Sequence, residues 1–169
     1  MLTQSAECSI IENAIGSAEL RKALPTFTLT LGALKMNKKA FIETVNGRCA
    51  YNMHNGLTVT DIGDDFCVVT AELIPTAMNP WGMAHGGFVY SMCDVASGVL
   101  ASGIERRGVT LSANMQYLRP SRGKSLRAEA KIIKSGRKVL FIETNVYNDE
   151  GVHTARGEFQ IFILEENAK

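Results

Sequence analysis

The sequence predicts an α+β domain in which an antiparallel sheet curls around one long helix. The run from Phe88 to Ile104 is apolar on nearly all sides, so a helix formed there must be covered by other elements over most of its surface. Two segments with strand character precede this run and four follow it. Short turns join most of the later segments, and turns of this length make neighbouring strands antiparallel. A sheet wrapped around the helix is the simplest arrangement that buries it.

The strands are predicted from alternating side chains, from β-branched residues and from the turns that bound them. The clearest alternation runs from Leu126 to Ile132, where every second residue is charged and the others are apolar. Turn residues follow at Ser135-Gly136 and again from Asn148 to Gly151. The first predicted strand begins near Leu57. The other five are expected at 66–74, 108–118, 126–132, 139–147 and 154–163.

The first part of the chain is predicted to be an N-terminal extension, residues 1–50, that leads into a domain of residues 51–169. Within the extension, Ser5 to Ile15 has apolar residues at helical spacing and is expected to form a short helix. Asn37 is placed to cap a second helix that runs through Val45 and ends near Asn46-Gly47. The extension is therefore expected to be partly helical.

Composition and charge exclude several classes of function. The net charge of +1 gives no reason to expect nucleic acid or an anionic membrane as a partner. The apolar run from Phe88 to Ile104 has 17 residues and contains Asp94, whereas a membrane-spanning helix needs about 20 apolar residues. The four cysteines show no CxxC spacing, which favours free thiols in a reducing compartment. We therefore expect a soluble cytoplasmic protein.

A set of short motifs resembles one family. Asn79, Gly82, His85-Gly86-Gly87 and Asp94 are followed by YLRP at 117–120 and KSGRKV at 134–139. Together they resemble the hotdog-fold acyl-CoA thioesterases, most closely the PaaI-like (phenylacetate-pathway) branch of the 4-hydroxybenzoyl-CoA thioesterase superfamily. The resemblance covers roughly residues 57–164. It implies a central helix wrapped by an antiparallel sheet, the hydrolysis of a small, medium or aryl acyl-CoA, and no cofactor besides the coenzyme A of the substrate.

The chemistry of thioester hydrolysis also fits these residue types. The reaction needs an activated water or a nucleophile, together with donors for the carbonyl oxygen as it gains negative charge. Gly86 and Gly87 stand at the start of the predicted helix, where N–H groups lack intrahelical partners and the helix dipole is positive. Asp94 supplies a carboxylate that can act as general base or as nucleophile.

The spacing within the helix predicts a homodimer. Gly86 and Asp94 are eight residues apart, which corresponds to ~12 Å along a helix axis. One thioester carbon cannot contact both groups of the same chain. If both act, they must come from two subunits whose helices pack side by side, so each dimer has two composite sites. The resemblance implies the same dimer, and it implies further that dimers pair into a homotetramer.

Other roles follow from the resemblance residue by residue. Asn79 matches an asparagine that orients the water or the thioester, and His85 is expected to order the turn before the helix. A hydroxyl that holds the water or Asp94 is expected from either Thr110 or Ser112, which lie two apart on one predicted strand face. The positions expected near the pantetheine arm and phosphates of coenzyme A are Arg119, Lys134, Ser135, Gly136 and Arg137.

Two other functions compete with hydrolysis. Hotdog hydratases and dehydratases use a carboxylate with a nearby histidine, and here His85 precedes the helix while no histidine follows Asp94 within it. A non-catalytic acyl-CoA-binding sensor would usually carry an effector domain, and the extension has no clear helix-turn-helix pattern. The three histidines show no metal-ligand spacing, so no metal is predicted.

Overall fold

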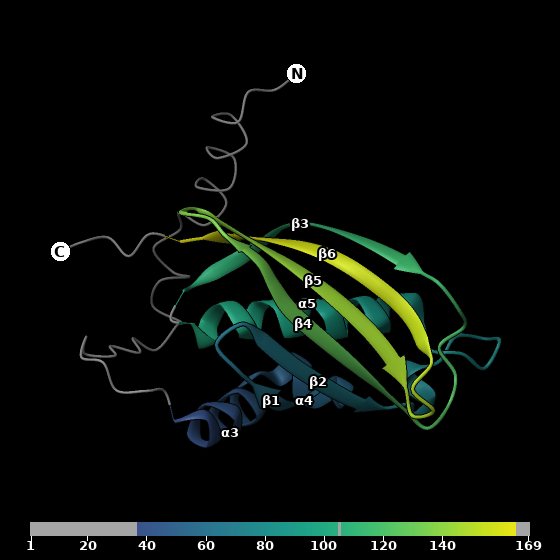
Figure 1. Ribbon diagram of the computed structural model, residues 1–169. Coiled ribbons are helices and arrows are strands. Elements are labelled where there is room, and N and C mark those ends of the chain that lie inside the picture. Colours follow the sequence, from purple (N-terminus) through teal and green to yellow (C-terminus); the bar gives the residue numbers. More distant parts are fainter. Residues whose placement is uncertain (1–36, 105, 165–169) are drawn as a thin grey trace, which may run out of the picture. The chain divides into compact units, whose positions relative to one another are not determined.

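Six strands form one antiparallel sheet that curves around the helix α5 in the computed structural model, which describes residues 37–104 and 106–164 (Figure 1). The strand order is β1-β2-β4-β5-β6-β3. The strands are β1 (Thr58–Ile62), β2 (Phe66–Glu72), β3 (Gly108–Tyr117), β4 (Ser125–Ser135), β5 (Val139–Asn148) and β6 (His153–Ile163). The predicted fold class and the six strands are thereby confirmed.

Two of the strand pairings join segments that are far apart in the chain. The hairpins β1-β2, β4-β5 and β5-β6 follow from their short connections. In contrast, β2 pairs with β4, and β3 pairs with β6, the last strand of the chain. Consequently β3 is an edge strand, although it lies in the middle of the sequence.

The central helix α5 (Gly86–Gly103) contacts all six strands. Its buried residues include Met92, Ala96 and Leu100, which recur every fourth residue and face the sheet. The described residues cover the opposite side of the helix less completely than the sheet covers this one. Gly87, Tyr90 and Ser102 are exposed there, and Asp94 is half-buried. The sheet thus covers one side of α5 and leaves an uncovered stripe that contains Asp94.

Two short helices lie beside β1 and β2 (Figure 1): α3 (Lys38–Arg48) and α4 (Ala50–Asn55). The side chain of Asn37 accepts a hydrogen bond from the backbone N–H of Ala40 at 3.2 Å, which confirms the predicted cap. The helix continues to Arg48, one residue beyond the Asn46-Gly47 pair near which it was predicted to end. The predicted helix at 5–15 lies outside the described residues, and the domain boundary at residue 50 remains a prediction.

The alternation predicted for the fourth strand is confirmed. Leu126, Ala128 and Ala130 of β4 are buried between the sheet and α5, while Arg127 and Lys131 are exposed on the outer face. Within the described ranges, no helix is both long enough and apolar enough to span a bilayer.

Candidate active site

The loop before α5 is organised by Asn79. Its side-chain oxygen accepts hydrogen bonds from the backbone N–H groups of Trp81 at 3.0 Å and Met83 at 3.2 Å. Its own N–H donates to the carbonyl of Met83 at 2.7 Å. Gly82 has a φ of 69°, a left-handed conformation that glycine adopts without strain. Asn79 therefore closes the turn that delivers the chain to the start of α5.

His85 is the N-cap of α5 and occupies most of the free donors of its first turn. Its Nδ1 accepts from the N–H of Gly87 at 3.0 Å, and its carbonyl accepts from the N–H groups of Phe88 and Val89. The N–H of Gly86 has no hydrogen-bond partner among the described residues. Of the two glycines, only Gly86 thus offers a donor at the positive end of the helix dipole.

Tyr117, at the end of β3, fixes the position of Gly86. Its hydroxyl donates to the carbonyl oxygen of Gly86 at 2.9 Å. This contact joins the edge strand to the first turn of α5, which the YLRP motif alone does not reveal. A tyrosine that is half exposed on an edge strand has no sequence signal that points to a helix terminus.

Asp94 is held by Thr110. The threonine hydroxyl donates to the Oδ1 of Asp94 at 2.7 Å, a short charge-assisted hydrogen bond that orients the carboxylate. The other carboxylate oxygen, Oδ2, has no hydrogen-bond partner among the described residues. The carboxylate therefore has one oxygen fixed and one available on the uncovered stripe of α5.

A β-bulge decides between the two candidate hydroxyls. Thr110 pairs with the buried Ile161 of β6 and faces α5, whereas Ser112 pairs with Gln160 on the outer face. The expectation that both hydroxyls lie on one strand face is wrong, because Leu111 is an extra residue that interrupts the alternation between them. Ser112 is therefore directed away from Asp94.

The groups around Asp94 remain protonated at neutral pH. Burial, and secondarily the Asp94 carboxylate, raise the pKa of Tyr90 above its usual range. Burial is also the main cause that raises the pKa of the Cys93 thiol to about 12, against a smaller lowering by its hydrogen bond to Thr144. A thiol of this kind is not a nucleophile at neutral pH. Neither Tyr90 nor Cys93 is therefore a candidate nucleophile beside the Asp94 carboxylate at neutral pH.

The residues expected to bind coenzyme A lie at both ends of the sheet. Lys134 and Ser135 are the last residues of β4, and Gly136 and Arg137 follow in the turn to β5, at the end of the molecule where α5 ends (Figure 1). Arg119 lies at the other end, after β3, and its guanidinium donates to the carbonyl of His153 at 3.1 Å. The structure thus does not bring Arg119 together with the other four.

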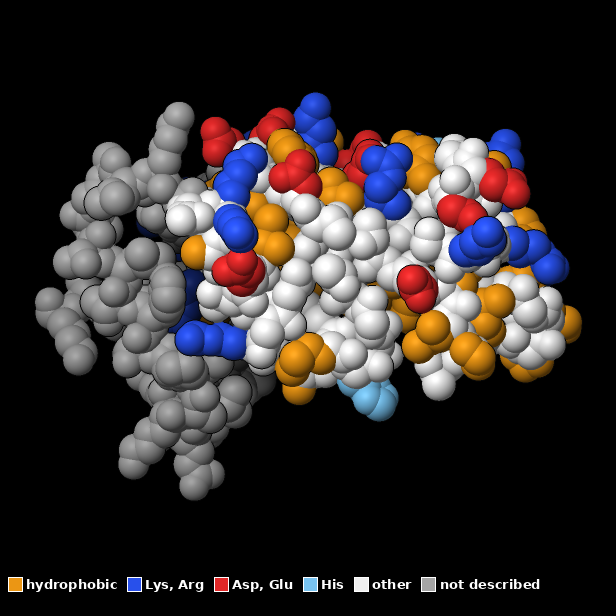
Figure 2. Space-filling model, turned by 90° about the horizontal axis from the view of Figure 1, so that it is seen from below, with side chains coloured by type: hydrophobic (Ala, Val, Ile, Leu, Met, Phe, Trp, Pro, Cys, Tyr) orange, Lys and Arg blue, Asp and Glu red, His pale blue; other side chains and the backbone are white. Residues whose placement is uncertain are grey.

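Exposed apolar side chains gather at the end where α5 begins, on the right in Figure 2. Trp81 is 74% exposed, and Tyr51, Tyr117 and Leu118 are each at least 45% exposed. Tyr51 of α4 hydrogen-bonds the hydroxyl of Ser91 on α5 at 2.6 Å. These side chains form an apolar surface beside Gly86, the kind of surface that a subunit or an acyl chain can cover.

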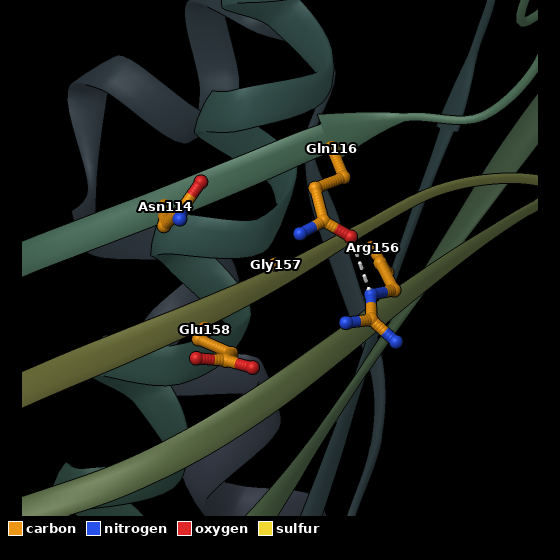
Figure 3. A pocket seen from close by; sticks show the side chains of 5 residues that line it. All are labelled: Asn114, Gln116, Arg156, Gly157 and Glu158. Carbon is orange, nitrogen blue, oxygen red and sulfur yellow. Dashed lines mark hydrogen bonds between the residues drawn. The ribbon is translucent and has the colours of Figure 1, made fainter.

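A shallow pocket lies elsewhere, on the outer face of the sheet between β3 and β6 (Figure 3). Arg156 donates to the side-chain oxygen of Gln116 at 2.8 Å across this pocket. Its other lining residues are Asn114, Gly157 and Glu158. None of the predicted site residues lines it, and the sheet separates it from Asp94. In residues 37–104 and 106–164, no three side chains of His, Cys, Asp or Glu are grouped so that they could hold a metal ion.

The fold and the site define a class of protein, a hotdog domain with an acidic side chain on its central helix. The family model of the thioesterase superfamily matches residues 82–155, which run from the loop before α5 into β6. The resemblance recognised in the sequence is therefore confirmed: residues 82–155 match the thioesterase superfamily, and the fold is the hotdog fold.

Similar proteins include enzymes from several bacteria. The medium/long-chain acyl-CoA thioesterase YigI of Escherichia coli K12 is 24% identical over 142 residues, which cover 73% of this chain and 88% of YigI. A thioesterase from Streptococcus pneumoniae TIGR4, crystallised with coenzyme A, is 25% identical with a TM-score of 0.62, over 66% of this chain and 88% of that one. The PaaI protein of E. coli shares the fold, with a TM-score of 0.70 at 18% identity, over 75% of this chain and 93% of PaaI.

Proposed function

We propose that this protein is an acyl-CoA thioesterase of the PaaI-like branch, which hydrolyses a small, medium or aryl acyl-CoA to the free acid and coenzyme A. The observation that carries the proposal is the pair of unsatisfied groups on α5: the N–H of Gly86 and the free oxygen of Asp94. One is a donor suited to an oxyanion and the other is a base or nucleophile. The acyl-CoA substrate of YigI and the coenzyme A bound to the S. pneumoniae thioesterase support the substrate class.

The reaction can follow either of two routes at Asp94. As a general base, the carboxylate takes a proton from water, the water oxygen attacks the thioester carbon, and the carbonyl electron pair moves to the oxygen. The Gly86 N–H donates to that oxygen, and the collapse of the intermediate expels the thiolate of coenzyme A. As a nucleophile, the carboxylate displaces the thiolate and forms a mixed anhydride, which water then hydrolyses.

The proposed site is shared between two subunits. Eight residues of continuous helix separate Gly86 from Asp94, about 12 Å along the axis, so one substrate cannot reach both in one chain. The uncovered stripe of α5 and the open edge of β3 lie on the side where a second copy would bring its own α5 alongside. We propose a homodimer with two composite sites, and a pairing of such dimers into a tetramer.

Thr110 is proposed as the residue that positions Asp94, and the turn at 134–137 as the part that binds the phosphates of coenzyme A. Two further crystal structures of a thioesterase from S. pneumoniae TIGR4 carry alanine in place of an aspartate and of a threonine, at the same separation along the chain as Asp94 and Thr110. The described cysteines Cys49, Cys67 and Cys93 are free thiols, which supports the cytoplasm as the location.

The central experiment is an assay of free thiol release from a panel of acyl-CoA substrates. Asp94→Asn keeps the shape and the Thr110 contact but removes the base, and we expect kcat to fall about a thousandfold. Thiol release that is unchanged in this variant would refute the mechanism. If the wild-type protein binds acyl-CoA but hydrolyses none of the panel, the protein is a sensor.

The oxyanion donor can be tested by replacing the N–H of Gly86 with the ring of a proline. Gly86 is the first residue of α5, a position that accepts proline, and His85 already has the extended backbone that precedes proline. Gly86→Pro therefore removes the N–H without interrupting the helix, and we expect kcat to fall at least a hundredfold. The matched control is Gly86→Ala, which keeps the N–H. The structure tolerates this alanine, because its Cβ would lie 3.4 Å from the Tyr117 hydroxyl, an ordinary contact distance. Equal activities in the two variants would exclude this donor.

A further inference from the structure

Arg106 has a fixed place in the connection between α5 and β3. Its backbone N–H donates to the carbonyl of Ala101 at 3.0 Å, which prolongs the end of the helix. The carbonyl of the next residue, Arg107, accepts from the N–H of Leu164 at 2.9 Å. The backbone is thus held on both sides of Arg106, whose side chain is half-buried.

The Arg106 guanidinium binds three consecutive residues of the turn between β4 and β5. Its Nη1 donates to the hydroxyl of Ser135 and to the carbonyl of Gly136, both at 2.9 Å, and its Nη2 donates to the carbonyl of Arg137 at 2.6 Å. All three acceptors are neutral, so the arginine neutralises no carboxylate there. Its rigid fork instead sets the orientation of two successive peptide groups.

This orientation turns a backbone donor outward. In a trans peptide the carbonyl and the following N–H point in opposite directions. Because the Gly136 carbonyl points at Arg106, the N–H of Arg137 points away from it. The turn is also closed tightly: a Cβ at Gly136 would lie 2.6 Å from the carbonyl oxygen of Val139. An outward N–H on a tight turn is a donor that an anion can take.

The exposed side of the same turn carries positive charge. Lys134 and Arg137 are both exposed. Among the described residues the ion pair within 4 Å is that of Arg127 with Glu129, so no described carboxylate neutralises either cation. The turn combines two cationic side chains with an outward amide, the donor set that phosphate takes.

We propose that Arg106 is a positioning residue that holds the turn at 135–137 in the form that binds the phosphates of coenzyme A. The inference rests on the proposed function, because it assigns this turn to the nucleotide end of the substrate. Arg106 itself faces the inner side of the turn and does not contact the phosphates. Its loss lets the Gly136 and Arg137 peptides rotate, which disperses the donors.

The test compares two thioesters of the same acyl group, one on coenzyme A and one on N-acetylcysteamine, which has no phosphates. In Arg106→Gln we expect KM for the acyl-CoA to rise about tenfold with kcat within twofold, and no change for the N-acetylcysteamine thioester. Arg106→Lys, which retains one donor group, should restore part of the affinity. Arg122→Gln, an exposed arginine at the opposite end of β4, is the control and should change neither substrate.

Two kinetic results would overturn the inference. One is an equal loss on both thioesters, which would indicate a merely structural role for Arg106; the other is no change on either. Calorimetric titration with free coenzyme A supplies a readout without turnover, and Arg106→Gln should bind it about tenfold more weakly. If the wild-type protein hydrolyses neither thioester, the proposed function fails while this titration still decides the role of Arg106. A wild-type protein that does not bind coenzyme A overturns both.

Discussion

The two edge strands of the sheet, β1 and β3, share one irregularity and differ in what lies against them. Each contains one residue that interrupts the pairing register, Thr60 in β1 and Leu111 in β3. Beside β1, Asn46 of α3 donates to the carbonyl of Val59 and accepts from its N–H, both at 2.9 Å. A helix of the same chain therefore satisfies part of the β1 edge.

The β3 edge has no such cover within the described part of the chain. Leu111, Tyr117 and Leu118 are exposed along it or just beyond it. An open edge strand is a template for pairing with another chain, and proteins normally shield it. Here the shielded edge carries no site residue, whereas the open edge carries Thr110, which binds Asp94. The contrast favours a second subunit on the side where the proposed catalytic groups lie.

Among the tests of the contrast between the two edges, the largest effect should come from a charge at the open edge. Leu111→Lys places an ammonium group at the bulge of β3, where a partner would have to desolvate it. We expect a monomer in analytical ultracentrifugation and a loss of activity of at least a hundredfold, since both composite sites disappear. Thr60→Lys is the matched control, because it places a lysine at the bulge of β1. It should change neither the oligomeric state nor the activity. A Leu111→Lys monomer with full activity would refute the shared site.

A smaller effect is expected within the site itself. Thr110→Val keeps the side-chain shape but removes the donor to Asp94, so the carboxylate loses its orientation, and kcat should fall about a hundredfold. Ser112→Ala, two residues away on the outer face, should keep full kcat. Steady-state kinetics on one acyl-CoA decide the point. The reverse ranking of the two variants would mean that the bulge does not direct the strand as described.

The shielded edge should affect stability rather than catalysis. Asn46→Ala leaves the N–H and carbonyl of Val59 without their partner, which should lower the free energy of unfolding by about 1–3 kcal/mol. Urea unfolding measures the change, and activity well below the midpoint should be unaltered. Asn55→Ala is a milder control, because Asn55 makes a single exposed contact with the carbonyl of Tyr51. An equal loss of unfolding free energy in the two variants would show that Asn46 does not stabilise the β1 edge specifically.

The smallest effect is a loss of stability at alkaline pH, which is absent at neutral pH. Burial raises the pKa of Cys67, in β2 beside the shielded edge, to about 12, as it does for Cys93 beneath Asp94. The folded thiols keep protons that unfolded thiols lose above pH 9. Their contribution to stability should therefore be constant below pH 9 and fall as the pH rises toward 12. Unfolding of Cys67→Ser and Cys93→Ser at pH 7 and 10 should show a smaller decline in each variant. If the stability of the wild-type protein did not fall between pH 7 and 10, burial would not raise the pKa of these thiols as described.

The secondary structure was largely predictable because it depends on local patterns. Alternation identifies β4, and Asn37 marks the start of α3 through its short side chain. The pairings of β2 with β4 and of β3 with β6 were not predictable, since no local signal records which distant strand lies alongside. The side of α5 that stays uncovered was missed for the same reason.

The candidate site was predictable in its residue types but not in its geometry. Asp94 and the two glycines follow from the motif, yet only the His85 contact shows that Gly87 is occupied and Gly86 is free. The bulge at Leu111 defeats the rule that residues two apart share a face. The role of Arg106 could not be predicted from the sequence. Two of its three acceptors are backbone carbonyls, which every residue possesses.

The continuous helix between Gly86 and Asp94 also has a genetic consequence. Each proposed site takes its donor from one chain and its carboxylate from the other, so a gene with Asp94→Asn and a gene with Gly86→Pro each encode an inactive protein. In a cell that expresses both, about half of the dimers are mixed, and each mixed dimer contains one site with neither defect. Two inactive alleles should therefore complement each other and restore about a quarter of the wild-type sites.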